Sequence, residues 1–299
     1  MHYYHSHGVM LRSEAELEAL SEVPAIPVID VNILPGDVPM KLQAPIGSGA
    51  CYAISRSKFL SWFNGIGRYS VQDGNQITYA ADDASDPTET PKLVTMAPLG
   101  VLLLQRKVTC LHASAVAMAN GAVLIVGRSV SGKSTMAAWL ASKGGVVLAD
   151  DFCSIFPGPK GGFYVNPVSS RLRLWPRTAD HFPDAKISWP LANSALRKAL
   201  VEFPQACYSQ PVQINRIVVL DVTSSGDGEM AKVGPQVAAK TLIRHIYGRQ
   251  FLTSMGMDRH SKDLAMQIAQ QCEVYRITRL KSSASVEDVG WNLLNQLYI

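Results

Sequence analysis

The spacing of hydrophobic and polar positions changes along the chain. Up to about residue 90 the pattern is mostly that of short strands between turns, because residues 25–34 and 67–81 alternate between apolar and polar side chains. Within the second segment, Asp73-Gly74 is typical of a hairpin turn. In this part of the chain a short helix is predicted only over residues 13–23.

Longer apolar segments follow a polar, Pro-containing stretch over residues 82–91, which predicts a boundary. Strand and helix patterns alternate beyond it. We therefore expect an α/β protein with two domains, a small β-rich N-terminal domain over residues 1–92 and a second domain over residues 93–299.

The pattern of the second domain predicts a series of helices and strands. Strands over residues 108–118 and 122–126 are joined by Asn120-Gly121, a strong hairpin signal. We expect helices over residues 96–107, 134–143, 237–247, 260–272 and 285–297, further strands over 146–149, 214–222 and 273–280, and a second hairpin over 161–176.

Composition narrows the function classes. The chain has 299 residues, 47% of them hydrophobic and 17% charged, a globular balance with a net charge of +4. It has no basic run dense enough to predict nucleic-acid binding. Five cysteines without a CxxC pair favour a reduced, cytoplasmic setting. The most apolar run, residues 97–104, is too short to span a membrane, and the first residues lack the apolar core of a signal peptide.

The sequence from Gly127 to Thr135, GRSVSGKST, has the spacing G-x-x-x-x-G-K-[ST] of a phosphate-binding loop. It follows an apolar strand and opens a helix, which is the context that the motif requires. Backbone N–H groups and the helix N-terminus then attract phosphates, Lys133 reaches the β- and γ-phosphates of ATP, and Ser134 binds Mg²⁺. The predicted nucleotide-binding residues are Gly127, Ser129, Ser131, Gly132, Lys133, Ser134 and Thr135.

Two aspartates follow the next predicted strand. A right-handed crossover makes strands 122–126 and 146–149 parallel, so their carboxyl ends lie at one edge of the sheet. Asp150 and Asp151 are then expected beside the loop, where ligands bind in open α/β sheets. One carboxylate can hold Mg²⁺ while the other takes a proton from an attacking hydroxyl group.

His112 is predicted to border the same loop. A two-residue turn at Asn120-Gly121 pairs Ala119 with Ala122, and the same register sets His112 opposite Ser129. An imidazole at that point would orient an aspartate or stabilise transferred charge.

Taken together, these segments resemble the catalytic domain of the HPr kinase/phosphorylase family. In that family a histidine-containing strand, a hairpin, a phosphate loop, a short helix and a "DD" follow one another, and here they read LHASAV, GRSVSGKST and LADD. The resemblance is specific over about residues 108–156 and looser over RLRLWP, INRIVVLD and YRITRL. It implies an HPr kinase-like (phosphoenolpyruvate carboxykinase-like) P-loop domain with a mixed sheet.

The resemblance also implies roles for individual residues. Lys133 would clamp the phosphates, Asp150 would act as general base and His112 as a catalytic neighbour. Ser134 would be a Mg²⁺ ligand and Asp151 a partner of the metal or of a water molecule. The cofactors implied are ATP and Mg²⁺.

The chain departs from the bifunctional members of that family at two points. Their metal-binding glutamate segment corresponds here to SSRLRLWP, which has no glutamate, and Thr135 stands where they have glutamate after the loop serine. Both differences weigh against phosphorolysis and against HPr as substrate.

An N-terminal β-rich part before such a domain resembles the kinase-only relatives that phosphorylate the C-terminal serine of lasso precursor peptides. The predicted function is therefore a serine kinase acting on a peptide or small protein. A small-molecule kinase of the same fold and a non-catalytic nucleotide-binding regulator remain alternatives, and the sequence leaves a homo-oligomer open.

Phosphoryl transfer needs positive charge beyond Lys133. Arg128, Arg171, Arg173 and Arg249 are all candidates, and the sequence does not choose among them. For Lys198 the pattern favours a solvated surface position.

Overall fold

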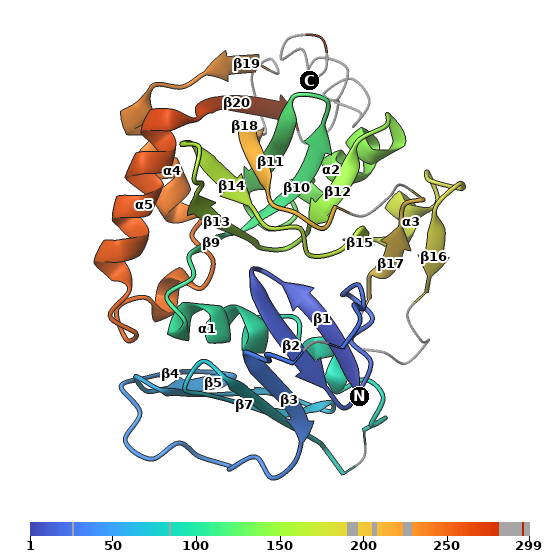
Figure 1. Ribbon diagram of the computed structural model, residues 1–299, viewed down its shortest axis with the longest axis vertical. Helices are drawn as coiled ribbons and strands as arrows, with labels where there is room; N and C mark the ends of the chain where they lie inside the picture. Colours follow the sequence, from blue (N-terminus) through green and yellow to red (C-terminus); the bar gives the residue numbers. More distant parts are fainter. Residues whose placement is uncertain are drawn as a thin grey trace. The chain divides into compact units, whose positions relative to one another are not determined.

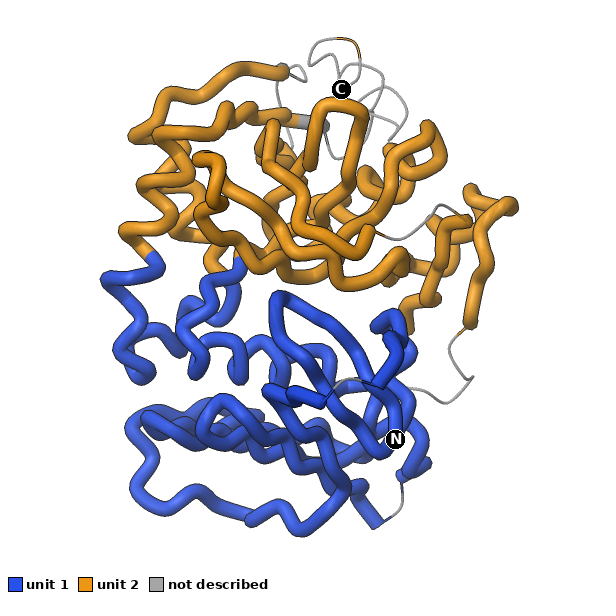
Figure 2. Tube along the Cα trace, viewed as in Figure 1, with its two compact units in different colours: residues 1–110, 247–261 blue, residues 111–246, 262–299 orange. Residues whose placement is uncertain are grey.

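The computed structural model describes residues 1–25, 27–83, 85–189, 197–204, 208–223, 229–280 and 295 (Figure 1). The chain forms two compact units, each containing strands and helices. Unit 1 comprises residues 1–110 and 247–261, and unit 2 comprises residues 111–246 and 262–299 (Figure 2). These units divide the chain at other points than the predicted domains 1–92 and 93–299, which remain a prediction.

Unit 1 is built on one mixed sheet with the strand order β1-β2-β3-β8-β7-β6-β5-β4. Strand β3 is parallel to both of its neighbours, and the other pairs are antiparallel. The strands are β1 (His2–Ser6), β2 (Val9–Ser13), β3 (Val31–Pro35), β4 (Gly47–Gly49), β5 (Tyr52–Ile54), β6 (Lys58–Phe63), β7 (Gly67–Gln72) and β8 (Gln76–Ala81).

Two sequence predictions for unit 1 are confirmed. Strands β7 and β8 form the hairpin predicted over residues 67–81, and Asp73 and Gly74 at its tip have φ values of 52° and 66°. The predicted buried helix is α1 (Ala97–Gln105), which packs against β6, β7 and β8. Unit 1 also contains the short helices η1 (Pro91–Leu93) and η2 (Arg249–Phe251).

The helix predicted over residues 13–23 is wrong. Ser13 ends strand β2, and the residues after it form turns. The Leu17 N–H group donates a hydrogen bond of 2.8 Å to the buried Tyr4 hydroxyl, and the Leu20 N–H group donates to the Leu17 carbonyl. These tertiary and local bonds replace the i→i−4 bonds that a helix would need.

Unit 2 contains a larger mixed sheet and, among the described residues, a separate three-stranded sheet. The large sheet has the order β12-β10-β11-β18-β14-β13-β9, with β20 beside β18 and β19 beside β20. Its strands are β9 (Cys110–Leu111), β10 (Ala113–Met118), β11 (Gly121–Gly127), β12 (Val146–Ala149), β13 (Cys153–Pro157), β14 (Phe163–Val165), β18 (Val212–Thr223), β19 (Glu229–Lys232) and β20 (Glu273–Leu280).

The three-stranded sheet, called the small sheet below, has the order β15-β17-β16. It consists of β15 (Arg171–Leu174), β17 (Ala199–Glu202) and β16 (Lys186–Ser188). The helices are α2 (Lys133–Ser142), α3 (Pro176–Ala179), α4 (Pro235–Arg244) and α5 (Asp258–Gln271), whose residues up to Ser261 belong to unit 1. They confirm the helices predicted over 134–143, 237–247 and 260–272. All but one residue of the helix predicted over 285–297 lies outside the described residues.

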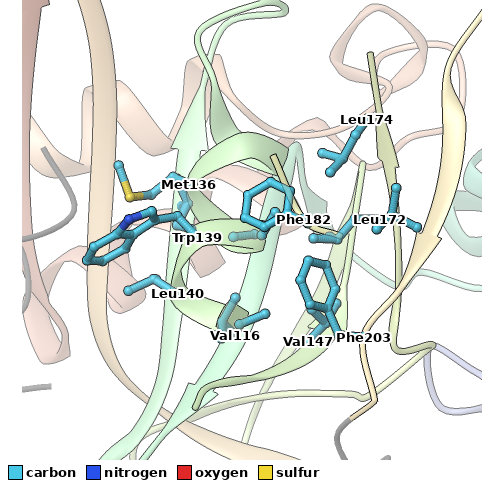
Figure 3. Close-up of a cluster of buried hydrophobic side chains, with 14 of the residues drawn as sticks. Val116, Met136, Trp139, Leu140, Val147, Leu172, Leu174, Phe182 and Phe203 are labelled. Atoms are coloured by element: carbon cyan, nitrogen blue, oxygen red, sulfur yellow. The ribbon is translucent and has the colours of Figure 1, made fainter. Parts of the chain in front are cut away.

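Helix α2 joins the two sheets of unit 2 through a common core. It is apolar on nearly every side and contacts β10, β11 and β12 of the large sheet and β15 of the small one. This packing holds the small sheet against the helix that follows the phosphate-loop motif. The core side chains labelled in Figure 3 are Val116, Met136, Trp139, Leu140, Val147, Leu172, Leu174, Phe182 and Phe203.

The predicted parallel arrangement of the two strands around α2 is confirmed. Strands β11 and β12 are each antiparallel to β10, which lies between them, so they are parallel to each other. Their carboxyl ends, at Gly127 and Ala149, therefore lie at the same edge of the sheet.

The predicted register of the first hairpin is wrong. Met118 pairs with Gly121, so the turn residues are Ala119 and Asn120, and Ala119 does not pair with Ala122. Gly121 has a φ of 118°, and a Cβ on it would lie 2.8 Å from the Gln213 carbonyl oxygen of β18. Close packing against β18 therefore draws Gly121 out of the turn and into the strand.

The hairpin predicted over residues 161–176 is also wrong. Strand β14 pairs with β13 and β18 in the large sheet, whereas β15 pairs with β17 in the small sheet. Between them the N–H groups of Val168 and Ser169 donate to the Leu148 carbonyl, at 2.6 and 3.2 Å. The chain thus crosses beside β12 instead of turning back on itself.

Candidate functional site

The phosphate-loop motif lies between β11 and α2, as its pattern requires. Gly132 caps the helix with a φ of 101°, and Val130, also in the left-handed region at 65°, is 81% exposed. A Cβ on Gly127 would lie 2.5 Å from Ser131 Oγ and 2.7 Å from the Leu220 carbonyl oxygen. The two motif glycines are therefore required by the tight path of the backbone.

Lys133 extends over the loop that precedes it. Its Nζ donates hydrogen bonds to the carbonyl oxygens of Gly127 and Arg128, at 3.0 and 3.2 Å. The side chain is buried, and this burial lowers the pKa of Lys133 although Asp150 and Asp151 oppose the shift. The ammonium group is thus held at the start of the loop.

His112 contacts both the lysine and the aspartate doublet. Its Nδ1 donates to the backbone carbonyl of Asp151 at 2.7 Å, because a carbonyl oxygen can only accept. Its Nε2 then carries a lone pair and accepts from Lys133 Nζ at 3.1 Å. Burial, followed by the charge of Lys133, lowers the pKa of His112, which favours this neutral form.

The predicted neighbourhood of His112 is therefore found, but for another reason than the predicted register. The residue precedes β10, and the register of the hairpin extended to it leads to Gly127 and not to Ser129. Its backbone N–H group donates to the His245 carbonyl at 2.7 Å. Burial, followed by the charge of His112, lowers the pKa of His245 to about 4.

Asp150 is held by three hydrogen-bond donors. Its Oδ1 accepts from Ser114 Oγ at 2.6 Å and from Ser134 Oγ at 2.9 Å. Its Oδ2 accepts from the backbone N–H group of Arg173 at 3.0 Å. Asp150 thus connects β10, the first turn of α2 and the small sheet.

Sequence reasoning missed Ser114 and His245. Ser114 lies two residues after His112, so the alternation of a strand would have set it on the same face as the histidine. His245 follows α4 at a large distance along the chain, and no local signal connects it to the loop.

Asp151 differs from Asp150 in both backbone and electrostatics. It has a φ of 67°, an uncommon value for a residue with a side chain. Burial raises its pKa, the neighbouring charge of Asp150 raises it further, and the charges of Lys198, Arg173 and Lys133 oppose the rise.

The remaining predicted residues differ in their exposure and in their partners. Ser129 is exposed, Thr135 is half-buried in the first turn of α2, and the buried Ser131 donates its N–H group to the Arg128 carbonyl at 3.1 Å. Arg171 forms an ion pair of 3.3 Å with Glu202, and Arg249 belongs to unit 1.

The oxygen atoms that would hold a metal are the Ser134 hydroxyl and the adjacent Asp150 carboxylate. Within the part of the chain that the structure describes, no group of three or more His, Cys, Asp or Glu residues could form a metal site. Mg²⁺ is commonly held by one or two carboxylates together with substrate phosphates and water, so the Ser134–Asp150 pair fits that ion.

Comparisons with known proteins give little to add. A scan against protein families finds no match, and a search of curated proteins finds none either. Among solved structures, the HPr(Ser) kinase/phosphatase from Coxiella burnetii matches with a TM-score of 0.31 and 8% sequence identity, over 63% of this chain and 89% of that one. Separately, among the described residues no helix combines the length and apolar character that a membrane crossing requires.

The chemistry of the site follows from these contacts. A buried ammonium group, a neutral imidazole, two hydroxyl groups and two carboxylates meet where two parallel strands end. Such a set can bind a polyphosphate and receive a proton from a nearby hydroxyl group.

Proposed function

We propose that this chain is a Mg·ATP-dependent phosphotransferase that moves the γ-phosphoryl group to a serine hydroxyl of a peptide or small protein. One observation carries the proposal. The loop lysine lies 3.1 Å from His112, while the next loop residue, Ser134, bonds to Asp150 at 2.9 Å. Phosphoryl transfer depends on this combination of a phosphate-binding cation, a metal-binding pair and a base.

Three features support ATP as the donor and Mg²⁺ as the metal. A loop with the glycine spacing of a phosphate-binding loop opens helix α2 at Gly132, and backbone N–H groups at a helix N-terminus attract phosphate oxygens. Lys133 is already directed toward the start of that loop. Ser134 and Asp150 offer the hard oxygen ligands that Mg²⁺ prefers, and when bound the ion neutralises charge on the β- and γ-phosphates.

The contacts favour an exchange of the roles that the family resemblance implies for the two aspartates. Both carboxylate oxygens of Asp150 already accept hydrogen bonds, one of them from Ser134, which suits a metal-binding position. Burial, followed by the charge of Asp150, raises the pKa of Asp151 and brings it closer to the ideal for a general base, while the charges of Lys198, Arg173 and Lys133 oppose the rise. We therefore assign the base to Asp151.

The proposed step moves one proton and one phosphoryl group. The Asp151 carboxylate takes the proton of the serine hydroxyl, and the hydroxyl oxygen forms a bond to the γ-phosphorus. The bond between that phosphorus and the β–γ bridging oxygen breaks, and its electron pair leaves with ADP. The His112 ring bonds to the Asp151 backbone carbonyl through Nδ1 and to Lys133 Nζ through Nε2. These two bonds hold the base and the cation in fixed positions.

The identity of the peptide substrate is the most specific claim of the proposal. A lasso precursor peptide with a C-terminal serine rests on the resemblance of the overall layout and of the motifs HASAV and RLRLWP. A small-molecule acceptor is the competing outcome of the test below.

The experiment measures transfer from Mg·ATP to synthetic peptides that end in serine, by the mass gained, together with ATP affinity by calorimetry. Asp151→Asn should lower the transfer rate by about 10²–10⁴-fold, the usual contribution of general base catalysis, with ATP affinity nearly unchanged. Asp180→Asn, a change of the same kind at the exposed C-cap of α3, should leave both unchanged.

Three results would contradict the proposal. Transfer that survives in Asp151→Asn but is lost in Asp150→Asn would return the base to Asp150. Phosphate gained only by small hydroxyl compounds would replace the peptide with a metabolite. Nucleotide binding with no transfer to any acceptor would favour a nucleotide-binding regulator.

A further inference from the structure

The loop supplies one buried cation, Lys133, but a phosphoryl group in transfer carries charge on three oxygens and needs further positive groups. Among the four arginines considered from the sequence, Arg171 and Arg173 lie on the small sheet. Arg171 is paired with Glu202 at 3.3 Å, whereas the charge of Arg173 acts on Asp151, as that of Lys198 does. The charge of Lys198 acts in addition on His112 and Lys133, which makes Lys198 the stronger candidate.

The small sheet is fixed to the doublet through its backbone. The N–H group of Arg173 in β15 donates to Asp150 Oδ2 at 3.0 Å. Leu172 and Leu174 of the same strand are buried against α2, so Arg173 and the residues that alternate with it lie on the opposite face. The strand that carries this face is bonded to Asp150 through its backbone.

Strand pairing brings Lys198 to this face. In the antiparallel ladder Arg173 pairs with Leu200 and Leu174 with Ala199, so the same register extended by one residue sets Trp175 opposite Lys198. Ala199 and Val201 are buried, so Lys198 alternates away from the core, as Trp175 does.

The side chains agree with this register. Lys198 Nζ lies 5.8 Å from the centre of the Trp175 ring, within the range of a cation–π contact, and Trp175 is 46% exposed. Burial is the main cause of the shifted pKa values of His112, Lys133 and Asp151. The charge of Lys198 opposes the rise in the pKa of Asp151 and adds to the fall in the pKa of His112 and of Lys133, so it acts on groups of both the loop and the doublet.

We propose that Lys198, which directly precedes β17 and is held over Trp175, is the second phosphate-binding cation of the site and contacts the γ-phosphoryl group of ATP. This inference rests on the proposed function. An ammonium group on a flexible stem, held by an exposed aromatic ring, is well suited to leave that ring for a phosphate oxygen. Lys198 would then act only on a nucleotide with a γ-phosphate, whereas Lys133 would also act on ADP.

The test compares the affinities of ATP and ADP, each with Mg²⁺, for the full chain by calorimetry. In Lys198→Ala the ATP affinity should fall about tenfold and the ADP affinity less than twofold, because an interaction with a charged group is worth roughly that ratio. Lys198→Arg should restore most of the preference for ATP. Arg171→Ala removes a cation from the same face of the same sheet and should change neither affinity.

The outcomes separate the two proposals. If the wild-type chain binds neither nucleotide, the proposed function is overturned and this inference with it. If it binds ATP more tightly than ADP and Lys198→Ala keeps that preference, Lys198 is not the second cation, while the proposed function stands. A wild-type chain that binds both nucleotides equally also overturns the inference, and thermal melting of each variant verifies that it is folded.

Discussion

On the loop side of the candidate site, β11, the loop and α2 follow one another directly in the chain. The loop lysine there is 7% exposed and its ammonium group bonds to two loop carbonyls. On the sheet side, β15 and β17 are joined by a long segment, and Arg173, Trp175 and Lys198 remain partly exposed. The loop side is thus a local structure with few alternatives, whereas the sheet side is assembled by strand pairing and keeps its cations adjustable.

This difference has a functional meaning under the proposed function. A rigid side can bind the part of the nucleotide that does not change during the reaction. An adjustable side can follow the phosphoryl group that moves. The most direct test of this difference is to remove one group from each side of the site.

Removal of the loop cation should have the largest effect. Lys133→Ala deletes the ammonium group that holds the start of the loop and leaves His112 Nε2 without its donor. We expect the affinities of both ATP and ADP to fall by about a hundredfold or more, since a charged hydrogen-bonded group is lost from a buried site. Calorimetry measures both, and a variant that lost only ATP affinity would contradict the division between the two sides.

Loss of one hydrogen bond to Asp150, the residue that connects the two sides, should have an intermediate effect. Ser114→Ala removes the 2.6 Å hydrogen bond to Asp150 Oδ1 and should lower the free energy of unfolding by about 1.5–3 kcal/mol, the usual range for a bond to a charged acceptor.

Ser142→Ala serves as its control, because the Ser142 hydroxyl donates to the neutral Trp139 carbonyl and should contribute only about 0.5–1.5 kcal/mol. Urea unfolding measures both variants. Equal losses of unfolding free energy in the two variants would mean that the charge of Asp150 does not strengthen its hydrogen bond with Ser114.

The smallest effect is expected on stability as a function of pH. The pKa of Asp151 is raised in the folded chain, so its protonated form is favoured there and its contribution to stability is lost as pH rises from the unfolded value through the folded one. Asp151→Asn should therefore raise the Tm by a few degrees at pH 7, with the gain shrinking toward pH 4. A gain independent of pH would show that the carboxyl group does not titrate in this way.

The hydrophobic pattern predicted most of the elements around the site, but not the pairing of every strand. It predicted the strand–loop–helix sequence around GRSVSGKST and the strand before the aspartate doublet, because both are local patterns. It failed for residues 161–176, where the amides of Val168 and Ser169 bond to Leu148 of a strand near in space. It failed also for residues 13–23, where the Leu17 N–H group donates a hydrogen bond to the Tyr4 hydroxyl.

The neighbourhood of His112 was predicted correctly from an incorrect register. Gly121 is drawn into β11 by its close approach to β18, a contact that no hairpin signal contains. The ring still reaches Lys133, because the backbone of His112 is held by His245 and its Nδ1 by the Asp151 carbonyl. Distant contacts replaced the predicted local one.

The sequence by itself determined that a glycine-rich loop follows one apolar strand and that two carboxylates follow the next parallel strand. Spacing and periodicity are sufficient for this, since a single crossover brings both strand ends to one edge. Only the tertiary structure decided which groups bond to the Asp150 carboxylate and that Lys198 lies over Trp175. Those relations depend on strand pairing and core packing between distant segments, which the order of residues along the chain does not express.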